Sequence, residues 1–271
     1  MALIQCTFFS EVLNLTTAMN VIVPQDRPHI PVQVRNPAQG ERHPVLFLLH
    51  GMTDNHTAWL RNTSIERYAE AKGLAVVMPE VDLSFYTDMA YGNRYWTFIS
   101  EELPALARTF FPLTDETAET FVAGLSMGGY GAFKLALRRP EMFAAAASLS
   151  GAVNMAGIHH SAPDERAKQF FQLIFGSDPI AGTDNDLVYL AKELGASASS
   201  KPALYQCCGT EDFLYEDNLI FRDAAQEAGL NLTYVEGPGA HEWSYWDEHI
   251  QKVLDWLPLQ LPAKPPADEE H

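Results

Sequence analysis

The sequence predicts an α/β fold with a mostly parallel central sheet, helices on both faces and an antiparallel strand pair at the N-terminus. Short apolar runs recur along the chain, and stretches with a helical period that end at Gly or Pro separate them. Strands that alternate with helices form a parallel sheet covered on both faces. With 271 residues, of which 47% are hydrophobic, the chain is long enough for one large domain and too apolar for a disordered chain.

Two β segments open the chain, Thr7–Leu15 and Ala18–Val23, and the polar Asn and Thr residues that break them predict the turn of an antiparallel pair. The next run, Val45–Leu49, is apolar at every position and is bounded by Pro44 and Gly51, which is typical of a strand buried on both faces. Similar runs predict the remaining parallel strands: Leu74–Met78, Thr120–Ala123, Ala144–Leu149, Ala203–Cys207 and Leu232–Val235.

Helical patterns fill the intervals between these strands, with Gly73, Pro140 and Gly229 as stops. The expected helices are Ser64–Lys72, Trp96–Phe110, Gly129–Arg138, Glu216–Ala228 and Ser244–Leu257.

One stretch departs from this rhythm. Met155–Ser200 is long, polar and rich in turn residues, so we expect an insertion that caps the domain. We therefore expect a single domain over residues 1–257 with a cap at about 155–200. The segment 258–271 combines Pro with acidic residues, which predicts a disordered tail.

The charge balance restricts the partners of the protein. The chain has 18 Lys and Arg residues against 35 Asp and Glu residues, and its formal net charge of −17 argues against a nucleic acid or an anionic lipid surface as the main partner. No apolar run approaches the roughly 20 residues that span a bilayer. The sequence leaves the formation of a homo-oligomer open.

The cysteines and the N-terminal residues predict the location. Cys6, Cys207 and Cys208 are an odd number with two adjacent, which is a poor framework for disulfides, so we expect buried thiols and a reducing compartment. The stretch Met1–Leu15 lacks the basic start, apolar middle and cleavage site of a secretion signal. We therefore expect a cytoplasmic protein.

The segment Gly124-Leu125-Ser126-Met127-Gly128 is a G-x-S-x-G motif that follows an apolar strand and precedes a helix. The motif alone arises by chance in about one chain in ten of this length. In this context it predicts a nucleophile elbow, a strained turn that holds a serine hydroxyl above the sheet edge. The two glycines let the turn close without a Cβ clash. An ordinary glycine-rich turn is the alternative.

A reactive serine needs a histidine base and a carboxylate, which follow it in the order Ser, Asp, His on this kind of sheet. Asp212 follows the strand that ends at Cys207, and His241 follows the next strand, so both are expected at the same sheet edge as Ser126. Three carboxylates near Asp212 are alternatives to it: Glu211, Glu216 and Asp217. His249 lies inside a helical pattern, where we expect it to face solvent.

Stabilising an oxyanion takes two backbone N–H donors. The amide of Met52 follows an early strand in the expected position, and the amide of Met127 opens the helix after the motif. Gly51 permits the sharp turn there, and His50 is expected to orient the loop rather than to act as a base. A plain strand-ending turn is the alternative. The candidates for lining a substrate pocket are Phe213, Trp243 and Gly51.

Two groups of side chains resemble metal ligands in composition. The first is His50, Asp54 and His56, and the second is His159, His160 and Asp164. Neither has a spacing typical of a metal site, so we expect no metal and no cofactor.

Taken together, these motifs resemble the esterase D and S-formylglutathione hydrolase branch of the α/β-hydrolases, and within it the bacterial tributyrin esterases. The resemblance covers most of the chain and includes the segments LLHGMTDNHTAW, GLSMGGYGAFKLAL, GTEDFLY and GPGAHEWSYW. It implies an α/β-hydrolase fold and a cytoplasmic serine esterase without a cofactor. It also implies that Ser126, Asp212 and His241 hold the catalytic positions and that Met52 and Met127 are the oxyanion donors.

The expected activity is hydrolysis of small acetyl to butyryl-type carboxylic esters through an acyl-enzyme. An S-formylglutathione hydrolase, or an acetyl-sugar or feruloyl esterase, would use the same residues. Acyl transfer to an alcohol other than water stays open, because the same acyl-enzyme serves both outcomes. A non-catalytic binding protein on this scaffold is disfavoured, since it has no need of the three side chains.

Overall fold

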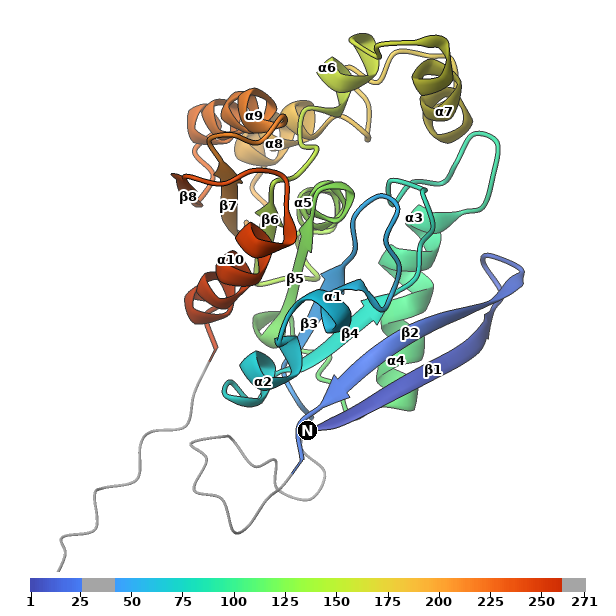
Figure 1. Ribbon diagram of the computed structural model, residues 1–271, viewed down its shortest axis with the longest axis vertical. Helices are drawn as coiled ribbons and strands as arrows, with labels where there is room; N and C mark the ends of the chain where they lie inside the picture. Colours follow the sequence, from blue (N-terminus) through green and yellow to red (C-terminus); the bar gives the residue numbers. More distant parts are fainter. Residues whose placement is uncertain (26–41, 260–271) are drawn as a thin grey trace, which may run out of the picture.

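The computed structural model describes residues 1–25 and 42–259, and these contain one eight-stranded sheet with the strand order β1-β2-β4-β3-β5-β6-β7-β8 (Figure 1). The strands are β1 (Ala2–Ser10), β2 (Leu15–Val23), β3 (Val45–Leu49), β4 (Ala75–Pro79), β5 (Thr120–Leu125), β6 (Ala145–Leu149), β7 (Ala203–Gly209) and β8 (Leu232–Gly237). β2 pairs antiparallel with β1 and with β4, and every pairing from β4 to β8 is parallel. This confirms the predicted fold class.

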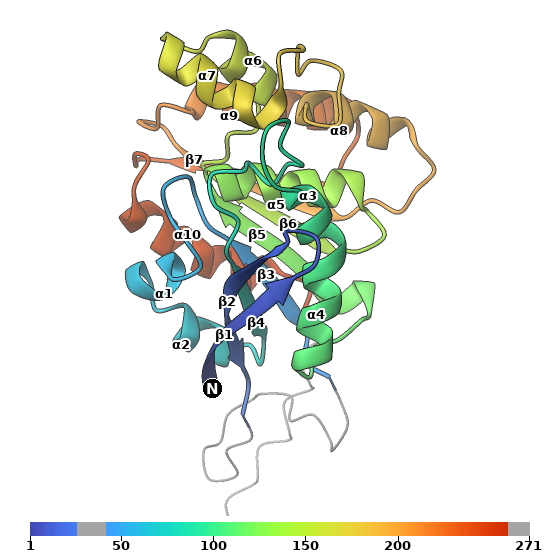
Figure 2. The ribbon, with the colours of Figure 1, turned by 90° about the vertical axis from the view of Figure 1, so that its right-hand side faces the viewer.

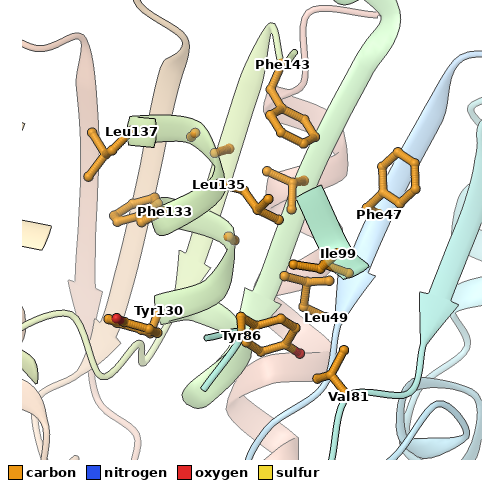
Figure 3. Close-up of a cluster of buried hydrophobic side chains, with 14 of the residues drawn as sticks. Phe47, Leu49, Val81, Tyr86, Ile99, Tyr130, Phe133, Leu135, Leu137 and Phe143 are labelled. Carbon is orange, nitrogen blue, oxygen red and sulfur yellow. The ribbon is translucent and has the colours of Figure 1, made fainter. Parts of the chain in front are cut away.

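The central strands are apolar throughout because both faces of the sheet are covered. Along β3, Val45, Phe47 and Leu49 join the buried cluster that includes helices α4 (Leu103–Phe110) and α5 (Met127–Arg138). Leu46 and Leu48 point to the other face, where α2 (Ile65–Glu70) and α10 (Trp243–Trp256) pack. Figure 2 shows α2 and α10 on one side of the sheet and α4 on the other, and Figure 3 shows the first cluster. Because side chains alternate along a strand, a run without polar residues needs two apolar layers.

The structure corrects the predicted turn of the N-terminal hairpin. β1 ends at Ser10 and β2 already begins at Leu15, so the turn lies before the Thr residues that were expected to form it. Asn14 takes a φ of 54°, and the carboxylate of Glu102 accepts the amide of Glu11 at 2.8 Å. The threonines remain in β2 because β-branched residues favour a strand. The contact with Glu102 is distant in sequence and therefore leaves no local pattern.

The predicted helix Trp96–Phe110 is helical but not uniform. A short α3 (Tyr95–Thr97) is followed by a π-helical stretch (Phe98–Glu102) and then by α4. Pro104 lies in the first turn of α4, where proline is tolerated because the first amides of an α-helix have no acceptor within it. The other helices on the two faces of the sheet are α1 (Ala58–Asn62) and α9 (Tyr215–Glu227).

Residues 155–200 contain three helices that the polar composition hides: α6 (Met155–His160), α7 (Glu165–Phe175) and α8 (Leu187–Ala196). The aspartates that indicate turns are N-caps: Asp164 accepts the Ala167 amide at 2.8 Å, and Asp186 accepts the Val188 amide at 3.1 Å. α6 and α7 lie at the end of the molecule opposite to the N-terminus (Figures 1 and 2). Most of the predicted tail, residues 260–271, lies outside the described residues.

Among the described residues, no helix combines the length and the apolar character that crossing a bilayer requires.

Candidate active site

Ser126 occupies a strained turn between β5 and α5. It has φ 53° and ψ −117°, a backbone conformation that residues other than glycine rarely adopt. Its amide donates to the Leu149 carbonyl at 2.9 Å, and its carbonyl accepts the amides of Tyr130 at 3.1 Å and Ala152 at 3.2 Å. These bonds to the helix and to the segment at the end of β6 hold the turn in place.

Both glycines of the motif are needed because backbones approach each other there. A Cβ atom on Gly124 would lie 2.4 Å from the backbone of Gly128. A Cβ atom on Gly128 would lie 2.5 Å from the carbonyl oxygen of Leu49 and 2.7 Å from that of His50. No side chain fits at such distances, so the motif packs the start of α5 directly onto the end of β3.

Asp212 and His241 lie on the loops after β7 and β8, and they join Ser126 in one chain of polar contacts. Nε2 of His241 lies 3.0 Å from Oγ of Ser126. Nδ1 of His241 lies 2.9 Å from Oδ2 of Asp212 and 3.1 Å from Oδ1. The Asp212 side chain has no exposed surface, and that of His241 is 18% exposed. A serine, an imidazole and a buried carboxylate in this order can activate the hydroxyl as a nucleophile.

The alternative carboxylates have other surroundings. Glu211 accepts the amide of Gly239 at 2.6 Å, which lowers the pKa of its carboxyl. Asp217 accepts the side-chain amide of Asn154 at 2.8 Å, and Glu216 is exposed. Of the four carboxylates, Asp212 is therefore the one that contacts the histidine. The bond from Glu211 ties together the loops that carry Asp212 and His241, a role that the sequence did not indicate.

Aromatic rings surround the imidazole of His241. The ring of Phe213 lies 4.5 Å from it between centroids, and the ring of Trp246 packs against it edge-on at 4.9 Å. Phe213 is 75% exposed. Trp243 is half-buried between Trp59 and Trp246, at 5.3 Å from each. Phe213 therefore lies at the open rim beside the imidazole, whereas Trp243 belongs to a packed tryptophan cluster.

The loop after β3 passes directly beside Ser126. A Cβ atom on Gly51 would lie 3.6 Å from Cβ of Ser126, and Met52 is the next residue, 44% exposed. His50 is buried; its Nδ1 lies 2.8 Å from the Gly51 carbonyl oxygen, and its Nε2 accepts the Val81 amide at 3.2 Å. The His50 ring thus braces this loop, and burial lowers the pKa of the ring below its usual range.

Sequence reasoning missed Glu80, which lies beneath this loop. Its carboxylate accepts the His56 ring nitrogen at 2.9 Å and lies 3.6 Å from His50. Burial raises the pKa of Glu80, but the hydrogen bond from His56 and the proximity of His50 outweigh it and lower the pKa overall. Burial raises the pKa of Asp54 on the same loop. Glu80 follows an apolar strand, so its position at the sheet edge was the one available signal.

The predicted position of His249 in solvent is wrong. His249 is 5% exposed and stacks on Tyr245 with 4.0 Å between ring centroids. Burial lowers the pKa of His249 to about 4. The helical pattern did not show which face of α10 is buried, and His249 lies on the buried face together with Tyr245, Trp246 and Ile250. Cys207 and Cys208 are buried free thiols, as predicted.

The two groups that resemble metal ligands do not form a centre. Across residues 1–25 and 42–259, no three or more His, Cys, Asp or Glu side chains are arranged to hold an ion. His50 and His56 instead share Glu80, and His159 packs on the ring of Phe171 at 6.0 Å.

Comparisons with known proteins identify the family of the chain. The model of the Esterase family, described as "Putative esterase", matches residues 27–257, which is most of the chain. An acetyl esterase from Caldicellulosiruptor saccharolyticus is 30% identical over 263 residues, which cover 95% of this chain and 98% of that protein.

Two solved structures from Staphylococcus aureus, each 34% identical, cover 94% of this chain and 98% of their own. They are FphF, a fluorophosphonate-binding serine hydrolase in a substrate-bound state, with a TM-score of 0.84, and the S-formylglutathione hydrolase FrmB, with a TM-score of 0.80. These matches confirm the resemblance read from the motifs. The chain therefore belongs to the Esterase family and is a carboxylic ester hydrolase of the serine hydrolase type.

Proposed function

We propose that this protein hydrolyses uncharged short-chain acyl esters with Ser126 as the nucleophile. The observation that carries this proposal is the line of contacts from Ser126 Oγ through His241 to the buried carboxylate of Asp212, at 3.0 and 2.9 Å. His241 takes the Ser126 proton while Oγ attacks the ester carbonyl. Asp212 holds the imidazole in one orientation and stabilises its protonated form.

The amides of Met52 and Met127 stabilise the oxyanion in this mechanism. The position of Gly51 beside Ser126 supports this, because Met52 is the next residue in the chain. Met127 is the first residue of α5, where an amide has no acceptor within the helix and the helix dipole favours negative charge. Such a donor typically contributes about 10²- to 10³-fold to kcat.

The acyl-enzyme forms when the bond between the carbonyl carbon and the alcohol oxygen breaks and His241 gives its proton to the departing alcohol. A water molecule then attacks the acyl group while His241 accepts a proton from it, and Ser126 leaves with that proton restored. The carboxylic acid departs and the free enzyme returns. No further reactant is required.

The charges around the site favour an uncharged alcohol group over an anionic one. Residues 209–217 and 236–243, which carry Asp212 and His241, contain no Lys or Arg. They contain five further carboxylates: Glu211, Glu216, Asp217, Glu236 and Glu242. Glutathione carries a net negative charge at neutral pH, so these side chains repel its thioester over a distance of about 8 Å at physiological salt.

S-formylglutathione hydrolysis is the second candidate, and the similarity to FrmB is the observation that favours it. Salt separates the two. If anionic thioesters are repelled, raising the ionic strength increases kcat/KM for S-formylglutathione and leaves that for p-nitrophenyl acetate nearly constant. A preference of orders of magnitude for S-formylglutathione at low salt would make the thioesterase the true activity.

The main test compares initial rates of wild type and Ser126→Ala on p-nitrophenyl acetate, butyrate and octanoate, and on acetylated xylose, methyl ferulate and S-formylglutathione. The expected loss is about 10⁴- to 10⁶-fold in kcat. Ser150→Ala is the matched control. Like Ser126, Ser150 follows a parallel strand and has a positive φ, but the imidazole of His241 contacts the hydroxyl of Ser126. Substantial hydrolysis by Ser126→Ala would overturn the assignment.

We also propose that the protein works in the cytoplasm, with a reducing environment that keeps Cys207 and Cys208 as thiols. Burial raises the pKa of Cys208 to about 12, so this thiol stays protonated and unreactive.

A further inference from the structure

One face of α5 holds two segments that are far apart in the sequence. Gly128, Gly131 and Lys134 follow each other at intervals of three residues, so they share a face of the helix. Gly128 leaves room for the backbone at the end of β3. Gly131 leaves room for Tyr86, whose ring would lie 2.4 Å from a Cβ atom at this position. Lys134 continues the same row one turn further along.

Lys134 is fully buried, and its ammonium group is surrounded by acceptors. Nζ donates to the Tyr86 carbonyl at 3.1 Å, to Thr87 Oγ1 at 2.7 Å and to Asn185 Oδ1 at 2.7 Å. The ring of Trp96 lies 5.3 Å from Nζ. Three acceptors match the three hydrogens of an ammonium, and none of them is a carboxylate. Burying such a cation is costly, and its pKa is lowered by that burial, so the position calls for a specific explanation.

The segment that Lys134 contacts has an unfavourable backbone conformation. Phe85 and Tyr86 are consecutive residues with φ of 49° and 51°. Residues other than glycine adopt this left-handed conformation at a cost in free energy. Ser84 Oγ accepts the Tyr86 amide at 3.1 Å, and Lys134 binds the carbonyl on the other side of the same residue. The backbone of Tyr86 is therefore held from both sides.

The Tyr86 side chain connects this segment to the loop beside Ser126. Its hydroxyl donates to the carbonyl oxygen of His50 at 2.8 Å, and the ring is completely buried. Figure 3 shows Tyr86 between Tyr130 and Leu49, with its hydroxyl on the side of Leu49 and Val81. The His50 carbonyl belongs to the peptide that leads into Gly51, and Met52 follows.

We propose that Lys134 is a positioning residue for the oxyanion loop, residues 49–52: it fixes the backbone of Tyr86, whose hydroxyl in turn fixes the His50 carbonyl. This proposal rests on the proposed function, in which the Met52 amide stabilises the oxyanion. It predicts that replacing Lys134 destabilises the transition state much more than it weakens binding of the ester. The reason is that the Met52 amide stabilises the carbonyl oxygen chiefly once this oxygen carries negative charge.

Three variants test the two contacts that join Lys134 through Tyr86 to the His50 carbonyl: Lys134→Met, Tyr86→Phe and the double variant. Each single variant is expected to lower kcat for p-nitrophenyl butyrate by about 10- to 100-fold, with KM within about threefold of wild type. The affinity for a trifluoromethyl ketone that forms a tetrahedral oxyanion should fall by the same factor as kcat. Because both residues act through the same bond, the double variant should lose little more than the worse single variant.

Tyr68→Phe is the control, since its hydroxyl donates to Asp247 and holds α2 to α10. It should keep kcat within about threefold of wild type. Circular dichroism and thermal unfolding establish that each variant is folded. If Lys134→Met does not fold, Tyr86→Phe decides alone, because it removes a single oxygen atom.

Wild-type kcat in folded Tyr86→Phe, or effects of the two single variants that multiply in the double variant, would overturn the proposal. Failure of the proposed function would look different, because wild type would be inactive on every ester or Ser126→Ala would remain active.

Discussion

The nucleophile side of the site and the side that carries Asp212 and His241 are built in different ways. Beside Ser126 the backbones are in close contact, since a Cβ atom on Gly128 would lie 2.5 Å from the Leu49 carbonyl oxygen. On the other side, close backbone contact is found where a Cβ atom on Gly209 would overlap the Gly239 carbonyl group, whereas a Cβ atom on Gly237 would meet nothing within 4 Å and Phe213 is 75% exposed. Packing fixes the nucleophile and its loop, whereas the loops of Asp212 and His241 combine close packing at the end of β7 with hydrogen bonds such as that from the Gly239 amide to Glu211. The open side is therefore where substrates can differ without disturbing the nucleophile.

Apart from the loss of Ser126 itself, the largest expected effect comes from the open side and depends on one contact. In Asp212→Asn the imidazole loses its carboxylate partner, and kcat should fall by about 10⁴-fold, while the fold stays intact. Glu211→Gln, next to it, should stay within about threefold of wild type, because the side-chain oxygen of glutamine can still accept the Gly239 amide. Rates on p-nitrophenyl butyrate check both variants. Equal losses would show that the loop, rather than the Asp212 contact, carries the effect.

On the packed side, Gly128→Ala should disturb the loop beside Ser126. The added methyl group displaces the backbone of Leu49 and His50, so kcat should fall by about 100-fold and stability by about 1 to 3 kcal/mol. Gly237→Ala is the matched change on the open side and should be nearly neutral in both. Urea unfolding and ester hydrolysis measure the two quantities. Similar behaviour of the two variants would contradict the contrast between the sides.

Behind the open side, His249 makes α10 sensitive to acid. Its folded pKa of about 4 lies below the unfolded value of about 6.5, so the unfolded chain takes up a proton first as the pH falls. Stability should therefore decline from about pH 6.5 toward pH 4, by about 2 kcal/mol between pH 7 and pH 5. Between pH 7 and pH 5, the free energy of unfolding of His249→Phe should fall by about 2 kcal/mol less than that of wild type. His160 is exposed, so the free energy of unfolding of His160→Phe should fall as much as that of wild type. Urea unfolding at the two pH values measures this change. An equal fall in wild type and both variants would refute the role of His249.

The smallest expected effect concerns the rim. Phe213→Ala removes an exposed ring that lies against His241, so KM for p-nitrophenyl butyrate should rise by about 3- to 10-fold with little change in stability. Phe110→Ala, which also truncates an exposed phenylalanine but at the end of α4, should leave KM constant. A lower kcat at constant KM in Phe213→Ala would instead indicate that the ring positions the imidazole.

The sequence predicts those parts of the molecule that depend on local patterns. The fully apolar run Val45–Leu49 identifies a strand between two layers, and Gly124 and Gly128 identify the strained turn at Ser126. Asp212 and His241 could be placed because each directly follows a strand, and parallel strands end at a common edge.

Contacts between distant segments escaped prediction. Glu102 holds the first hairpin, Tyr86 holds the His50 carbonyl, and Glu80 joins His50 to His56. None of these pairs has a spacing that a helix or strand period would reveal. The helices of residues 155–200 were missed for another reason: an aspartate such as Asp164 has the same local appearance in a turn as at a helix N-cap.

The role of Ser126 as the nucleophile is tested most directly by labelling the protein with a fluorophosphonate and mapping the adduct by mass spectrometry of peptides. We predict a single adduct on Ser126, which is absent in Ser126→Ala and forms far more slowly in His241→Ala. Labelling of another residue, or equally fast labelling in His241→Ala, would contradict this role.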